Sequence, residues 1–282
     1  MSDNENYPRI YLLPNLMTAG NLFCGFAAVL RIFEATLPNA DVIGLYHHAV
    51  IFILGAFVFD MLDGRLARLG GQESPFGREF DSIADVISFG IAPALLVYKI
   101  VLIDFHRWGW LMAFFYLLCG AMRLARFNCI AQQNSESTTK DFEGFPIPAA
   151  AGLIASLTMF LLSMQEGERQ IGNWKYALPV LIIFLSFMMF SRVRYPSFKG
   201  VNWRTQRSIP RFLLIIVLLL ISAINYQWMP ALLFVLFLIY GFVRPFISMA
   251  LRREIEEEEE DIDSFKSENG EDIKSETPAP KL

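Results

Sequence analysis

Four aspartates, Asp60, Asp63, Asp81 and Asp85, interrupt long apolar stretches of the sequence. Asp60 and Asp63 are three residues apart and Asp81 and Asp85 are four apart, so each pair falls on one face of a helix. A short, polar turn rich in glycine separates the two pairs. Because helices joined by a short turn pack antiparallel, we expect the four carboxylates to converge in one cavity.

Converging carboxylates repel one another unless cations lie between them. Ligands that are all oxygen favour Mg²⁺ or Mn²⁺ over zinc. Two such ions about 4 Å apart can hold the attacking and the leaving oxygens of a phosphoryl transfer. As an alternative, the aspartates could form a structural ion-pair network with Arg65, Arg68 and Arg78. Ionisable residues inside membrane spans are functional by default, which favours the metal site.

The composition indicates a membrane protein. Of the 282 residues, 54% are hydrophobic and 18% are charged, against roughly 25% charged in soluble domains. Eight apolar segments are about as long as a membrane crossing requires, although the sixth is short. These predicted spans are 15–33, 45–66, 81–102, 108–127, 148–165, 176–190, 209–225 and 228–251.

The sequence therefore predicts an all-α polytopic membrane protein with about eight transmembrane helices. Residues 1–253 form the membrane domain, in which the stretch 7–14 could be an interfacial helix. Residues 254–282 form an acidic tail with few large apolar side chains, which we expect to be disordered. Because the basic residues flank the spans, nucleic acid is not an expected partner.

Lysine and arginine indicate the orientation, because they collect on the cytoplasmic side of a membrane. With eight spans and a cytoplasmic N-terminus, most of them fall on the inner side. That arrangement places both termini and the aspartates at the cytoplasmic face of the cell membrane. The predicted outer segments carry only Lys99, Arg107, Arg169 and Lys175.

The spacing of the aspartates also carries a resemblance to a known family. The pattern Asp60-x2-Asp63-Gly64-x2-Ala67-Arg68-x8-Gly77-x3-Asp81-x3-Asp85 resembles the complete signature of the CDP-alcohol phosphatidyltransferases. These integral membrane enzymes move a phosphatidyl or similar group from a CDP-linked donor to an alcohol and release CMP. The resemblance implies that all four aspartates ligate metal and that Asp85 also serves as general base. It further implies that the nucleotide diphosphate is held by Gly64, Ala67, Arg68 and Gly77.

Two further stretches, 13–28 and 122–152, resemble the phosphatidylserine synthase branch of that family. This resemblance implies CDP-diacylglycerol and L-serine as substrates. Since a carboxylate pairs well with arginine, we expect Arg123 or Arg126 to bind serine, with Asn128 adding a hydrogen bond. The same arginines could instead anchor the protein to lipid headgroups.

Two alternatives stay open at this point. One is another member of the family, a phosphatidylglycerolphosphate or phosphatidylinositolphosphate synthase, which would consume a different alcohol. The other is a divalent-cation transporter, which would carry acidic residues deep in several spans rather than at one end of two adjacent helices. The sequence also leaves open whether two copies form a homodimer.

Overall fold

The computed structural model describes residues 11–70, 74–133, 141–166, 176–191, 194–196, 225 and 227–240. The chain divides into a unit of Met1–Leu238, which is the subject below, and a second unit of Ile239–Leu282. Nearly all of the seventh predicted span, the end of the eighth and the acidic tail lie outside the described residues. So does the first half of the stretch 7–14, whose last three residues belong to the first helix.

Five helical stretches in the described part are long and apolar enough to cross a membrane. They coincide with the first five predicted spans, which confirms a polytopic, mainly helical membrane protein. The sixth and eighth predicted spans contain shorter apolar helices, α7 (Ala177–Phe190) and Met229–Tyr240. Four of the five membrane-length stretches are continuous α-helices, namely α1 (Leu12–Glu34), α2 (Val42–Gly70), α5 (Arg107–Gln133) and α6 (Ile147–Glu166).

The third span is made of three consecutive helical segments. It begins as α3 (Pro75–Asp85), continues as a π-helix, η1 (Val86–Ile91), and ends as α4 (Ala92–Ile100). A short 3-10 turn, η2 (Leu102–Phe105), follows.

Pro93 explains part of the irregularity in this span, since it has no N–H for the Phe89 carbonyl four residues earlier. The buried Tyr116 hydroxyl donates to that carbonyl instead, at 3.0 Å. The π segment begins directly after Asp85. Segments of this kind are frequent at functional sites.

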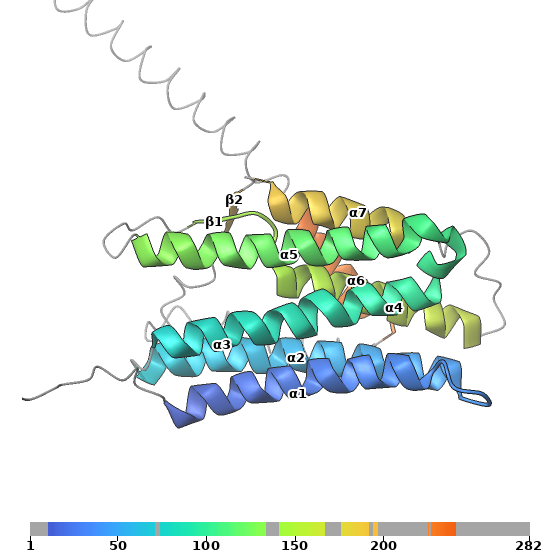
Figure 1. Ribbon diagram of the computed structural model, residues 1–282, viewed down its shortest axis with the longest axis horizontal. Helices are drawn as coiled ribbons and strands as arrows, with labels where there is room; N and C mark the ends of the chain where they lie inside the picture. The colour runs from blue at the N-terminus through green and yellow to red at the C-terminus, as the bar shows by residue number, and fades with distance from the viewer. Residues whose placement is uncertain are drawn as a thin grey trace, which may run out of the picture. The chain divides into compact units, whose positions relative to one another are not determined.

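Small residues let the helices approach closely. In Figure 1, α1 lies along α2, and it also packs against α3, η1 and α4. Helix α5 packs against α4 and α7, and α6 packs against α2 and α7. Small side chains at helix interfaces are typical of membrane bundles. Those that are fully buried include Ala28, Ala49, Ala56, Ala92, Ala150 and Ala151.

Large apolar side chains also lie on the outside of the bundle, as a lipid environment requires. In water, an exposed apolar surface of this extent would mark an aggregation or binding surface. Examples are Phe23, Phe26, Phe33, Val180 and Phe187, each more than half exposed.

Two three-residue strands pair the segment before α6 with the segment after α7. Strand β1 (Asp141–Glu143) pairs antiparallel with β2 (Arg194–Pro196), so that Phe142 lies opposite Tyr195. The all-α prediction omits them because three residues are too few for an alternating pattern. Gly144 follows β1 with a φ of 83°, a conformation that favours glycine. Helix α6 then begins one residue before the predicted fifth span, with Pro148 in its first turn.

Candidate active site

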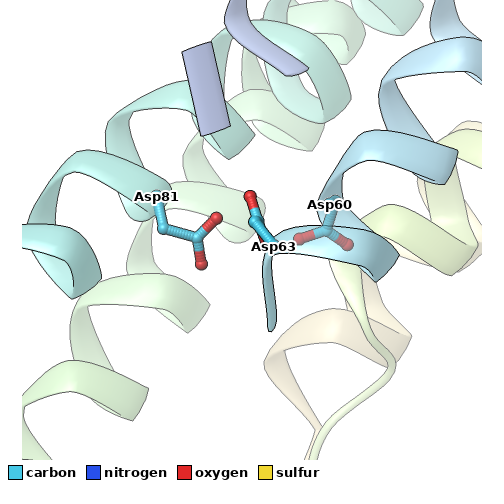
Figure 2. Close-up of side chains that lie close together, drawn as sticks. All are labelled: Asp60, Asp63 and Asp81. Atoms are coloured by element: carbon cyan, nitrogen blue, oxygen red, sulfur yellow. The ribbon is translucent and has the colours of Figure 1, made fainter. Parts of the chain in front are cut away.

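Three of the four predicted aspartates come together where α2 and α3 face each other. One carboxylate oxygen from each of Asp60, Asp63 and Asp81 lies within 4.8 Å of the other two. Figure 2 shows these side chains pointing toward one another, Asp60 and Asp63 from one helix and Asp81 from the other. The antiparallel arrangement that brings them together follows from the short connection between Gly70 and Pro75.

Asp85 lies one helical turn beyond Asp81 and outside the group of three converging oxygens. Its side chain is 5% exposed, and its Oδ1 accepts a hydrogen bond from Asn21 Nδ2 at 3.0 Å. Its charge nevertheless interacts with those of the other three aspartates. From the start of α3, Asp81 is about 9 Å and Asp85 about 15 Å along the helix, given 1.5 Å per residue. Asp85 therefore forms the deeper edge of the acidic site.

Helix α1 forms a third wall of the site, which the sequence analysis missed. Thr18, buried in α1, lies with its Oγ1 3.0 Å from Asp63 Oδ2 and 3.2 Å from the Pro14 carbonyl oxygen, so one hydroxyl proton serves both acceptors. One turn further, the fully buried Asn21 donates to Asp85. The signal for this wall was present, because Asn15, Thr18 and Asn21 follow one another at three-residue steps in an apolar span.

The small residues of the signature line the same region. Gly64 and Ala67 follow the aspartates along α2 and are partly buried. At the start of α3, the Gly77 N–H donates to Oγ of the N-cap Ser74 at 3.0 Å. A Cβ at Gly77 would lie 3.3 Å from Asn15 Oδ1, so α1 approaches the backbone closely there. Arg68 belongs to α2, but its side chain lies outside the described part of the structure.

The converging carboxylates fit a hard divalent cation. Two unit charges about 4 Å apart repel by roughly 4 kcal/mol at an effective dielectric constant of about 20. Asp81 Oδ1 is buried and has no hydrogen-bond partner in the described part of the chain. A purely structural network would be expected to satisfy this oxygen. The donor set, all carboxylate oxygen, is the one that Mg²⁺ and Mn²⁺ prefer. The cluster could therefore bind a metal ion.

Arg123 and Arg126 lie on the part of α5 that returns to the end of the bundle where α2 meets α3. Arg123 is 9% exposed, its charge interacts with that of Asp85, and its buried Nε has no partner among the described residues. Arg126 is less buried. Its Nη2 lies 3.2 Å from where a Cβ on Gly144 would stand, at the turn before α6. The charges of the two arginines also interact with each other, and Arg123 is the more buried of the two.

Asn128 links α5 to α3 through side-chain hydrogen bonds. Its Nδ2 donates to Ser82 Oγ at 2.9 Å and to Glu79 Oε2 at 3.3 Å, which uses both amide protons. These contacts flank Asp81 and help to hold α3 in place. The carbonyl oxygen is the part of this side chain that a substrate could use.

Comparisons with known proteins cover the helices that form this site. Residues 11–190, from just before α1 to the end of α7, match the model of the family described as CDP-alcohol phosphatidyltransferase. The chain is 37% identical over 237 residues to the CDP-diacylglycerol–serine O-phosphatidyltransferase of Helicobacter pylori, a match that covers 83% of this chain and 91% of that one. It is 31% identical to the Bacillus subtilis enzyme of the same name, over 66% of this chain and 91% of that one.

A third relative extends the similarity to archaea. The archaetidylserine synthase of Methanothermobacter thermautotrophicus is 33% identical over 209 residues, which cover 73% of this chain and 78% of that one. The family match includes every described helix that contributes to the acidic site. From the extent of that match and from these relatives, we conclude that the chain belongs to the CDP-alcohol phosphatidyltransferase family and is a transferase.

Proposed function

We propose that this protein transfers a phosphatidyl group from CDP-diacylglycerol to the hydroxyl of L-serine and releases CMP. The observation that carries the proposal is the pairing of the acidic site with a buried cation. Asp60, Asp63 and Asp81 converge, and the charge of the buried Arg123 interacts with that of Asp85. The first part suits a nucleotide diphosphate with its metal, and the second suits an acceptor that carries a carboxylate. The names of the relatives support serine as that acceptor.

Asp60, Asp63, Asp81 and Asp85 would hold the metal in this proposal, and we favour two ions of Mg²⁺ or Mn²⁺. Bound there, the ions would supply charge stabilisation on the phosphate oxygens of donor and leaving group. Thr18 orients Asp63 for this purpose through its 3.0 Å hydrogen bond. The small side chains at Gly64, Ala67 and Gly77 would let the CDP moiety approach the backbone, and Arg68 would neutralise phosphate charge.

Asp85 would act as the general base. It takes the proton of the serine hydroxyl while that oxygen forms a bond to the phosphorus of the phosphatidyl group. The bond between this phosphorus and the bridging oxygen breaks, and CMP leaves with that oxygen. A positioned base contributes typically about 10²–10⁴-fold to such a step. Oδ1 of Asp85 already accepts from Asn21, so Oδ2 is the oxygen we assign to the proton.

Arg123 would bind the serine carboxylate. Its guanidinium is buried and its charge interacts with that of Asp85, so a carboxylate bound to it would bring the neighbouring hydroxyl toward the base. Arg126 and Asn128 are secondary candidates. Arg126 lies toward Gly144, and both amide protons of Asn128 are in use.

The location of the site suits a lipid donor. The aspartates lie within about 15 Å of the end of α2 at Gly70 or the start of α3 at Pro75, so the diacylglycerol chains can remain in the bilayer while the nucleotide reaches water. From the distribution of lysine and arginine, we propose that this end faces the cytoplasm, as do both termini. The enzyme would then act in the cell membrane.

The test is an acceptor comparison with purified protein in lipid nanodiscs. CDP-diacylglycerol and Mg²⁺ are supplied with serine, glycerol 3-phosphate or inositol phosphate in separate reactions, and CMP and lipid products are quantified. We expect CMP and phosphatidylserine in equal amounts, and little CMP with the other acceptors. Preference for another alcohol would replace serine with that alcohol and leave the donor chemistry intact. A lack of CMP with every acceptor would reject the transferase mechanism.

A further inference from the structure

Asn21 occupies a central position in the site although it is not part of the aspartate signature. It is fully buried in the middle of α1, and its Nδ2 lies 3.0 Å from Asp85 Oδ1. An ionised carboxylate only accepts hydrogen bonds, so the amide must present its NH₂ group to Asp85. This amide is the side-chain donor that the structure gives to Asp85.

One hydrogen bond fixes the part of α1 that carries this amide. The backbone carbonyl of Asn21 accepts a hydrogen bond from Ser88 Oγ, in the π-helix η1, at 2.9 Å. Gly25, one turn along α1, permits the contact, because a Cβ there would collide with the side chain and Cα of Ser88. Helix α1 is thus held to the segment that follows Asp85 through the same residue that contacts its carboxylate.

We propose that Asn21 is a positioning residue for the general base, which holds the carboxylate plane of Asp85 so that Oδ2 faces the acceptor hydroxyl. This inference rests on the proposed function, because it assigns Asp85 the role of base. A carboxylate without the amide bond would rotate about its Cβ–Cγ axis, and the fraction of molecules with an oxygen aligned to the acceptor would fall. The role acts on the chemical step rather than on substrate binding.

The test compares Asn21→Leu, which keeps the approximate shape of the side chain but removes the donor, with the parent enzyme. Ser186→Ala is the matched control. Ser186 is also fully buried, and its hydroxyl bonds Ile182 within α7, away from the aspartates. The measurements are kcat, the KM of each substrate, CDP-diacylglycerol binding by calorimetry and the melting temperature.

We expect kcat to fall about 10- to 100-fold in Asn21→Leu, the range for losing a hydrogen bond to a charged group, with both KM values within about twofold of the parent. Ser186→Ala should keep the parent kcat. In an Asp85→Asn background, Asn21→Leu should lower kcat by less than about twofold further, because the two residues act as a unit.

Other results would overturn the inference. A parent-like kcat would show that the donor is dispensable, and a raised serine KM with unchanged kcat would make Asn21 a substrate ligand. If Asn21→Leu fails to bind the donor, Asn21→Ala supplies the comparison, since it removes the amide without adding a charge or a branched apolar side chain. If both variants fail to bind it, Asn21 is a structural residue. If the parent enzyme forms no phosphatidylserine, it is the proposal of serine as acceptor that fails. The kinetics of Asn21→Leu would then be measured with the alcohol that the parent enzyme uses.

Discussion

Replacement of Arg123 by alanine should impair the use of serine far more than the use of CDP-diacylglycerol. Arg123 is 9% exposed and its charge interacts with that of Asp85, so a carboxylate bound to it would be little screened by water. A hydrogen bond to a charged group contributes roughly 1.5–3 kcal/mol. At about 1.4 kcal/mol per tenfold, serine affinity should fall about 10- to 100-fold. Arg123→Lys should recover only part of this loss. Its ammonium group keeps the positive charge but cannot form the forked pair of hydrogen bonds.

The assay is steady-state kinetics with each substrate varied in turn. Arg126→Ala is the matched control, because its guanidinium lies toward Gly144 and its loss should affect serine use less. Serine amide adds a second test, since it keeps the hydroxyl but lacks the carboxylate charge. The parent enzyme should use serine amide poorly, and Arg123→Ala should discriminate less between it and serine.

Either of two results would show that Arg123 does not bind the serine carboxylate. One is a serine saturation curve in Arg123→Ala that matches the parent. The other is an equal loss of donor and acceptor binding, which would make Arg123 a ligand of the phosphates. A selective serine defect in Arg126→Ala alone would move the acceptor site to Arg126, toward the turn before α6.

Three further predictions concern the metal, the base and the topology. A chelator should abolish activity and Mg²⁺ or Mn²⁺ should restore it, because converging carboxylates without a cation repel one another; full activity in chelator would contradict the metal site. Asp85→Asn should lower turnover about 10²–10⁴-fold while CDP-diacylglycerol still binds, as measured by calorimetry, and near-normal turnover would remove Asp85 as the base. In a variant without its native cysteines, single cysteines at Gly71 and Glu260 should react with impermeant reagents only from the cytoplasmic side, and one at Gly167 only from outside. Labelling of position 71 from outside would invert the proposed orientation.

The sequence predicted the spans well because a membrane crossing demands a long apolar run. The first five predicted spans each coincide with a membrane-length helix, and their boundaries shift by a few residues. The convergence of Asp60, Asp63 and Asp81 was also predictable, because a short connection leaves two helices few ways to pack. The internal structure of the third span was not. The π segment after Asp85 depends on tertiary contacts, such as the Tyr116 hydrogen bond to the Phe89 carbonyl.

The contribution of α1 could not be derived from its own residues. Thr18 and Asn21 are polar residues in an apolar span, but their spacing does not say which neighbouring helix they face. The packing of α1 against both α2 and α3 decides that, and it gives each residue a different aspartate. Arg123 and Arg126 pose the same problem. They lie three residues apart on α5, yet Arg123 is buried and its charge interacts with that of Asp85, whereas Arg126 is partly buried with its Nη2 near Gly144.

The most direct test of the central claim is to follow the hydroxyl oxygen of serine through the reaction. Purified protein is incubated with CDP-diacylglycerol, Mg²⁺ and serine that carries a heavy oxygen isotope in its hydroxyl group, and both products are analysed by mass spectrometry. Attack by the serine hydroxyl on the phosphatidyl phosphorus predicts that all of the label appears in phosphatidylserine, in equal amount with unlabelled CMP. Label in CMP, or release of CMP without labelled lipid, would contradict the account.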